Sequence, residues 1–165
     1  MSVIGLISDT HGLVRPEIAH IFNGVELILH AGDVGGAAVL QTLSGIAPVE
    51  AVFGNVDDPH DPALKAERSV TLRGVTIHVS HGHELGRPMP DRVLARYAGD
   101  VVVFGHTHRA VIVHGDNGRI AVNPGAAGPR RFDVQPSVAL LTLHRGRASV
   151  EIVSISSSSA GRAQG

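Results

Sequence analysis

Seven side chains that can bind metal ions follow five short apolar runs of this 165-residue chain, and most of them stand beside a glycine. They are Asp9, His11, Asp33, Asn55, His81, His106 and His108. The alternation of apolar runs with helical patterns over the first two-thirds of the chain predicts that these runs are strands. Because ligands of open α/β sheets bind beyond the carboxyl ends of the strands, we expect the seven side chains to converge on one site.

The types of ligand indicate which metals the site would take. Carboxylate and amide oxygens combined with imidazole favour Mn, Fe, Co, Ni or Zn over Mg or Ca. The chain has no cysteine, which excludes thiolate ligands. Seven ligands are too many for one four-coordinate ion and suit two, and a carboxylate with two oxygens is the natural bridge between two ions. We therefore expect two divalent ions, Mn²⁺ first, with Ni²⁺, Co²⁺, Fe²⁺ or Zn²⁺ as alternatives.

Each motif taken alone has an ordinary explanation. The Asp-x-His and Gly-Asp pairs are both compatible with plain surface turns. The two His-x-His pairs are more specific, because side chains two positions apart point the same way from an extended chain. It is the repetition at successive strand ends that favours a metal site. His83, in the first His-x-His pair, could orient a ligand or contact the substrate. His30 could be a buried strand histidine or a support for Asp33.

The elements that must position these residues give an α/β fold, a two-sheet β-sandwich flanked by helices, with one mixed sheet and one mainly antiparallel sheet. Strands are expected over residues 3–7, 27–30, 49–53, 70–72, 75–80, 101–104, 110–113, 119–122, 138–144 and 148–155. Helices are expected from Pro16 to about Asn23 and over residues 37–43 and 90–97. Residues 1–155 are predicted to form one domain, and the Ser-, Gly- and Ala-rich residues 156–165 a disordered tail.

Composition excludes several classes of function. The 14 basic and 15 acidic residues nearly cancel and form no basic run, so no platform for nucleic acid is evident. No apolar stretch approaches the ~18 residues that a membrane span needs. The N-terminal residues show no basic segment of a signal peptide, and a cytoplasmic location is expected.

This ordered set of motifs resembles the calcineurin-like metallophosphoesterase superfamily, in particular its small prokaryotic phosphodiesterases, from residue 7 to about residue 131. The resemblance implies a four-layer αββα sandwich with two metal ions at the strand ends. It implies a first metal on Asp9, His11 and His108, a second on Asn55, His81 and His106, and Asp33 as the bridge. Residues 123–130 resemble the Asn-Pro-Gly-Ser…Pro-Arg stretch of the same branch, with Ala126 in place of Ser.

One position departs from many members of the superfamily. They carry a histidine after the ligand asparagine, and that histidine is thought to protonate the leaving group, whereas this chain has Val56. Valine cannot donate a proton, and general acid catalysis typically contributes 10²–10⁴-fold. The small phosphodiesterase branch also lacks this histidine. The sequence therefore favours substrates with an easily departing leaving group, or another proton donor such as His83 or water.

The predicted function is hydrolysis of small phosphodiesters by a dinuclear metal centre and a metal-bound hydroxide. Catalytic roles are predicted for Asp33, Asn55 and His83, and substrate contacts for Asn55 and Arg15. Two dications, two carboxylates and one hydroxide leave about one positive charge, which a singly charged diester neutralises and a monoester dianion overshoots. A homo-oligomer is compatible with the family that the chain resembles.

Two other functions are compatible with the same fold. The first is a non-catalytic metal-binding scaffold like the one in the eukaryotic retromer complex, where the catalytic residues are degraded. All seven ligand positions match in this chain, which argues against that function. The second is a DNA-end nuclease, but such relatives carry additional DNA-binding domains. This chain has neither their length nor a basic surface signature.

Overall fold

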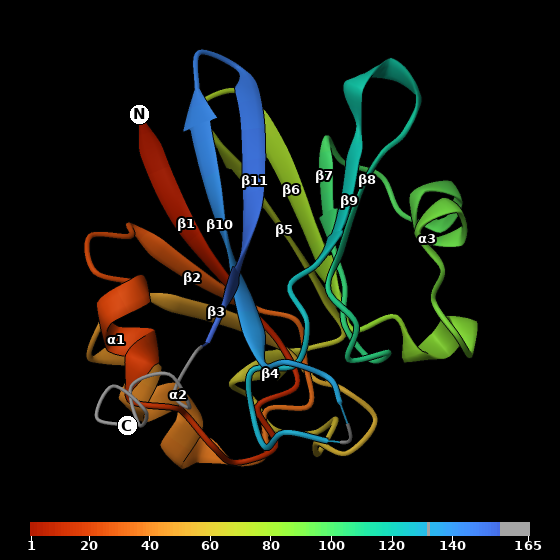
Figure 1. The fold of residues 1–165 in the computed structure, drawn as a ribbon. Helices are drawn as coiled ribbons and strands as arrows, with labels where there is room; N and C mark the ends of the chain where they lie inside the picture. The colour runs from red at the N-terminus through yellow and green to blue at the C-terminus, as the bar shows by residue number, and fades with distance from the viewer. Residues whose placement is uncertain (132, 156–165) are drawn as a thin grey trace.

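The computed structural model describes residues 1–131 and 133–155, which form two β-sheets and a small number of helices (Figure 1). The helices are α1 (Glu17–Ile21), α2 (Ala37–Ser44) and α3 (Pro90–Arg96), with short 3₁₀ helices η1 (His83–Leu85) and η2 (Asp116–Gly118). The disordered tail predicted over residues 156–165 lies outside the described residues. Across the part of the chain that is described, the helices are too short or too polar to cross a bilayer.

The first sheet has six strands in the order β11-β10-β1-β2-β3-β4. Its strands are β1 (Ser2–Ile7), β2 (Leu27–His30), β3 (Val49–Val52), β4 (Leu64–Lys65), β10 (Ser137–His144) and β11 (Arg147–Ser154). Strands β1 to β4 are parallel, and the β10–β11 hairpin joins β1 in antiparallel orientation. The C-terminal hairpin thus returns to the N-terminal strand and completes the sheet that carries the first predicted ligands.

The second sheet has five strands in the order β5-β6-β7-β9-β8. Its strands are β5 (Glu67–Leu72), β6 (Val75–Ser80), β7 (Val101–Val103), β8 (Val111–His114) and β9 (Ile120–Asn123). The prediction that this sheet is mainly antiparallel was wrong, because β6, β7 and β9 run parallel and only the two edge pairs are antiparallel. The chain passes from β7 to the far edge at β8, so the β8–β9 hairpin turns back and brings β9 beside β7.

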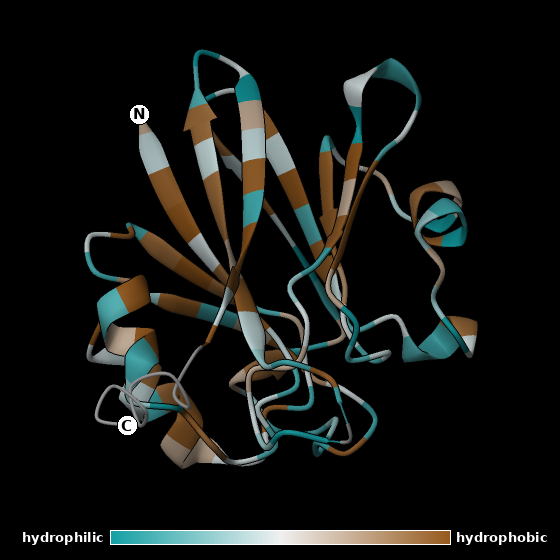
Figure 2. Ribbon diagram, viewed as in Figure 1, coloured by the Kyte–Doolittle hydropathy of each residue, from teal (hydrophilic) through white to brown (hydrophobic). Residues whose placement is uncertain are grey.

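Three hydrophobic clusters define four layers. The largest lies between the two sheets and includes Leu6, Leu29, Ile77 and Val103. A second packs α1 and α2 on the outer face of the first sheet, and a third packs α3 on the outer face of the second. Strands β2 and β7 are therefore covered on both faces, and they are largely hydrophobic along their length (Figure 2). The αββα architecture predicted from the resemblance is confirmed.

The layered arrangement brings the polar strand ends together. The parallel strands β1, β2 and β3 of one sheet, and β6 and β7 of the other, end at the same end of the sandwich. The loops that follow them gather at the end away from the N-terminus, in the lower centre of Figure 1. The apolar strands thus form a rigid frame for loops that carry charged and imidazole side chains.

Candidate metal centre

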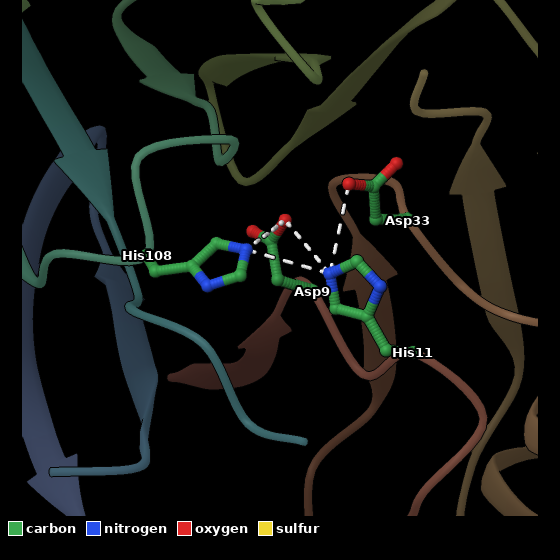
Figure 3. Close-up of side chains that lie close together, drawn as sticks. All are labelled: Asp9, His11, Asp33 and His108. Carbon is green, nitrogen blue, oxygen red and sulfur yellow. Dashed lines mark hydrogen bonds and ion pairs between the residues drawn. The ribbon is translucent and has the colours of Figure 1, made fainter. Parts of the chain in front are cut away.

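A first group of four predicted ligands meets where the loops of β1, β2 and β7 come together. Asp9, His11, Asp33 and His108 each offer one donor atom, and these four atoms lie within 4.8 Å of one another. Nε2 of His108 lies 3.4 Å from Oδ1 of Asp9, and Nε2 of His11 lies 3.7 Å from Oδ2 of Asp33. Figure 3 shows the two imidazoles on either side of the Asp9 carboxylate.

A second group shares one residue with the first. Donor atoms of Asp33, His81 and His106 also lie within 4.8 Å of one another. Nε2 of His81 is 3.3 Å from Oδ2 of Asp33. The amide oxygen of Asn55 lies 3.1 Å from Nε2 of His81 and 3.2 Å from Nδ1 of His106. The structure therefore brings all seven predicted side chains together, in two groups with Asp33 common to both.

Most of these residues have a backbone conformation that is uncommon for side chains other than glycine. Five of them have φ in the left-handed region, between 44° and 72°: Asp9, His11, Asp33, His106 and His108. Asp, Asn and His tolerate this region better than other residues, but each instance still costs free energy and such residues cluster at functional sites.

Two glycines allow the loops to approach the carboxylates. A Cβ atom at Gly54 would overlap the carboxylate of Asp33, and one at Gly105 would overlap the hydroxyl of Ser8 and lie against the carboxylate of Asp9. Any larger residue at either position would displace a carboxylate. Both glycines immediately precede predicted ligands, so their lack of a side chain sets the distance between neighbouring loops.

The buried carboxylate of Asp9 has one oxygen without a hydrogen-bond donor. Its Oδ2 accepts from the Ser8 hydroxyl at 2.7 Å and from the backbone N–H of His106 at 3.2 Å. Its Oδ1 is buried and has no hydrogen-bond partner, and it faces His108. A buried, unpaired carboxylate oxygen is costly unless a cation compensates it. The carboxylate and imidazole donors around this atom fit divalent transition ions.

The carboxylate of Asp33 stays ionised in this environment. Burial alone would raise its pKa, but the hydrogen bond and charge of His81, with the backbone N–H of Val56, lower the pKa to about 2. That N–H lies 3.1 Å from Oδ1, which leaves Oδ2 toward His11 and His81. The carboxylate is thus held in one orientation between the two groups.

The imidazoles differ in their readiness to bind a cation. Burial lowers the pKa of His11 and of His106, so both are neutral near pH 7. Burial also acts to lower the pKa of His81, but the hydrogen bond to Asp33 and the two nearby carboxylates raise it overall. Nδ1 of His81 donates to the carbonyl of Ala31 at 2.7 Å, which leaves Nε2 toward the centre. This is the usual way in which a backbone carbonyl orients a ligand histidine.

Other polar side chains support the loops without reaching the centre. Asp57 accepts from the backbone N–H groups of Val34, Gly35 and Gly54, and so ties the loop after β2 to the loop after β3. Asn123, fully buried at the end of β9, bonds to the loop of His106 and His108. The sequence alone assigned no definite role to residues 123–130, which resemble a family motif. In the structure, the first of these residues, Asn123, supports the loop of His106 and His108.

His30 is a buried strand histidine with both ring nitrogens hydrogen-bonded, as one of the two interpretations of the sequence predicted. Its Nδ1 accepts from the backbone N–H of Gly32 at 3.1 Å. Its Nε2 donates to the hydroxyl of Thr10 at 2.9 Å, and that hydroxyl donates to the carbonyl of Val34. Burial lowers the pKa of His30 to about 4. This neutral imidazole links the loops that carry Asp9 and Asp33, so it is a strand histidine and a support at once.

Two further predicted residues lie near the centre. His83 is on η1, with its ring centroid 5.3 Å from that of His81 and 6.3 Å from that of His106, and its Nδ1 is buried without a hydrogen-bond partner. Nε of Arg15 donates to the carbonyl of Gly128 at 3.2 Å. The catalytic role of His83 and the phosphate contact of Arg15 stay predictions.

An open pocket of about 460 Å³ lies over the two groups. Besides five of the seven predicted ligands, it is lined by Val56, Thr107, Arg109, Arg131 and Val134. The two arginines were not among the residues predicted from sequence. Arg109 directly follows a predicted ligand, which was a signal that could have been used, whereas Arg131 reaches the pocket only through the folding of its loop.

Comparison with known proteins agrees with this geometry. A family model described as the calcineurin-like phosphoesterase superfamily domain matches residues 1–146. A protein of Methanothermobacter thermautotrophicus named probable metallophosphoesterase is 35% identical over 162 residues, which cover 92% of this chain and 91% of that protein. The phosphodiesterase YfcE of Escherichia coli K12 is 31% identical in a match that covers 81% of this chain and 89% of that protein.

A solved structure supports the fold independently. A single mutant of Vps29 from Entamoeba histolytica matches with a TM-score of 0.76, covering 93% of this chain and 99% of that one. At 21% identity this likeness shows a shared fold and no more. The family model and the relatives, which match along most of their own length, identify the protein. The chain belongs to the calcineurin-like phosphoesterase superfamily and is a metal-dependent phosphoesterase.

Proposed function

We propose that the protein hydrolyses small phosphodiesters at a centre of two divalent metal ions, with Mn²⁺ as the first candidate. The observation that carries this proposal is that Asp33 belongs to both groups of donor atoms. Asp9, His11 and His108 would hold one ion with Asp33, and Asn55, His81 and His106 would hold the other. Ions in such a site polarise the phosphoryl oxygens and lower the pKa of a water nucleophile to about 7.

The residues of the chain would orient the substrate in this pocket. The oxygen of the Asn55 amide faces His81 and His106, so its NH₂ group is left to donate to a phosphoryl oxygen. Arg109 and Arg131 line the same pocket and supply positive charge for an anion. Arg15 is a further proposed phosphate contact, because it directly follows the loop of Asp9 and His11 in the sequence. His83 is the proposed proton donor, since it lies beside the second group.

The charge of the metal centre favours a diester, and Val56 favours a substrate with a good leaving group. Asp9 and Asp33 are the only carboxylates among the seven ligands, so two dications would leave a positive centre that one diester anion and a water-derived hydroxide neutralise. Val56 is 57% exposed and lines the pocket where many relatives have a histidine. No proton donor stands at that position, and a leaving group that departs as a stable anion needs none.

The test is metal removal followed by reconstitution. The protein would be stripped with a chelator, reloaded with Mn²⁺, and assayed with bis(p-nitrophenyl) phosphate beside p-nitrophenyl phosphate, with bound metal counted by elemental analysis. We expect about two ions per chain, hydrolysis only after reloading, and a clear preference for the diester. Absence of turnover with Mn²⁺, Ni²⁺, Co²⁺ and Zn²⁺ would instead favour a metal-binding scaffold of the same fold.

A further inference from the structure

We infer that an apolar recess beside the metal centre binds the ring of one ester group, so that the protein selects phosphodiesters with an aromatic substituent. This inference rests on the proposed phosphodiesterase function and adds the class of substrate. The recess has a volume of about 280 Å³ and lies between the segment before α3, the end of β7 and the start of β8. Its apolar lining is Pro88, Met89, Pro90, Phe104, Ala110 and Val111.

The size and chemistry of the recess fit part of a ligand. Pockets that enclose a whole small molecule usually measure about 300–1,000 Å³ and combine apolar walls with a few polar groups. This recess lies just below that range and is mostly apolar, which suits a single ring or ring pair rather than a complete substrate. The polar groups at its mouth are the side chains of Arg87, Thr107 and Arg109.

The recess shares lining residues with a hollow that reaches the metal centre. A second hollow, of about 430 Å³, is lined by Gly86, Arg87, His106, Thr107 and Arg109. Arg87, Thr107 and Arg109 thus line both hollows, and His106 is a predicted metal ligand. A phosphoryl group held at His106 would therefore have one ester oxygen directed past Thr107 toward the recess.

Arg109 lies where the phosphoryl group and the ring would meet. It lines the metal pocket, the connecting hollow and the recess. Within residues 1–131 and 133–155, the arginine–carboxylate pairs Arg68–Glu50 and Arg96–Glu84 do not involve Arg109, and Arg109 has no carboxylate partner there. A guanidinium group can pair with a phosphoryl oxygen and also stack on an aromatic face. Its position thus links anion binding to ring binding.

Met89 at the edge of the recess supports the same conclusion. The residue is 44% exposed, which is uncommon for a large apolar residue in this structure. A methionine side chain is flexible and adapts to apolar partners of different shape. An exposed methionine next to a small apolar recess is therefore a suitable contact for rings of more than one shape.

The inference can be tested by binding rather than by turnover. The Mn²⁺-loaded protein would be titrated in a calorimeter with inorganic phosphate, methyl phosphate and phenyl phosphate. We expect phenyl phosphate to bind at least about tenfold tighter than methyl phosphate, because the ring buries apolar surface in the recess. Ala110→Leu fills the recess from an exposed position and should reduce this ratio to about one, while the affinity for inorganic phosphate stays unchanged.

The controls separate this inference from the proposed function. Ala95→Leu adds the same side chain on an exposed position of α3 outside the recess lining and should leave the ratio as it is. Equal affinities for methyl and phenyl phosphate in the wild-type protein would overturn the inference, and so would a ring preference that survives Ala110→Leu. If the Mn²⁺-loaded wild-type protein preferred phenyl phosphate but did not hydrolyse diesters, the proposed function would be contradicted. The recess would still be supported as a binding site.

Discussion

The side-chain amide of Asn123 donates to the hydroxyl of Thr107 at 3.1 Å, across the space between β9 and the loop after β7. The same NH₂ group donates to the carbonyl of Gly105 at 3.2 Å, and the amide oxygen accepts from the backbone N–H of Gly125 at 2.9 Å. Asn123 is fully buried, and its bonds to Gly105 and Gly125 are buried, whereas the bond to Thr107 is partly buried. One side chain thus holds the turn that contains His106 and His108.

We expect Asn123→Ala to weaken metal binding by about 10–100-fold, which is typical for loss of a group that orients the ligands. The loss also leaves the buried backbone N–H of Gly125 without its partner and removes one hydrogen bond each from Gly105 and Thr107, so the free energy of unfolding of the metal-free protein should fall by about 1–3 kcal/mol. Competition with a fluorescent chelator measures the first effect and urea unfolding the second. Asn23→Ala, at an exposed position after α1, is the matched control. An unchanged metal affinity in a folded Asn123→Ala protein would show that Asn123 supports the fold only.

Asp33→Asn should be the most damaging single change at the centre, because Asp33 is shared by both groups of ligands. The amide keeps the shape of the side chain but removes the charge that two dications require. Elemental analysis of the Mn²⁺-loaded variant should find fewer than one ion per chain, with diester hydrolysis reduced by at least about 100-fold. Asp58→Asn, on an exposed loop nearby, should match the wild-type protein. Two tightly bound ions and full activity in Asp33→Asn would refute the proposed bridge.

The stability of the metal-free protein should fall as the pH falls from about 6.5 to about 4, in part because of His30. Burial lowers the pKa of His30 from 6.5 to about 4. Between these values the unfolded chain binds a proton that the folded chain excludes, so the free energy of unfolding drops by up to ~3 kcal/mol. Urea unfolding at pH 7 and pH 5 should show a smaller loss for His30→Gln than for the wild-type protein. His144→Gln, at an exposed position, should keep the wild-type loss, and an equal loss in all three proteins would contradict this explanation.

Val56→His should add a second proton donor for the leaving group, beside the one proposed at His83. The position is exposed and lines the pocket, so a histidine fits without repacking the core. Hydrolysis of diesters with a poor leaving group, such as phenolate, should rise at least about tenfold, because general acid catalysis contributes most when the leaving group is basic. Release of p-nitrophenolate should change little. Val56→Gln supplies similar bulk without an acid, and an equal gain in that variant would indicate a steric effect.

The strand ends and their ligands could be predicted because each apolar run is followed by a polar residue that is not needed to form the strand. Asp33 follows a fully buried strand, and His106 follows β7 by three residues. Period and punctuation of this kind are local properties of the chain. Short strand–helix–strand spacing also predicts that the strands are parallel. The convergence of the ligands then follows from this parallel arrangement.

The remaining features depend on contacts between distant segments. Strand β4 has two residues, too few for any pattern, and exists because Leu64 pairs with Ala51 of β3. The parallel pairing of β7 with β9 depends on where the β8–β9 hairpin packs in the sheet. Turn residues in the sequence predict the hairpin but not its neighbour. Arg109 and Arg131 are exposed loop residues whose side chains reach the pocket only once the sheets are packed.

The left-handed backbone at five ligand positions has a consequence for the history of this architecture. A left-handed conformation costs a non-glycine residue about 1–2 kcal/mol, less for Asp and His, and glycine adopts it freely. In a lineage that no longer needs the metals, glycine at these positions would relieve strain and remove buried charge together. Loss of catalysis is then a downhill step in folding energy, and a stable scaffold lies a few substitutions away from an enzyme.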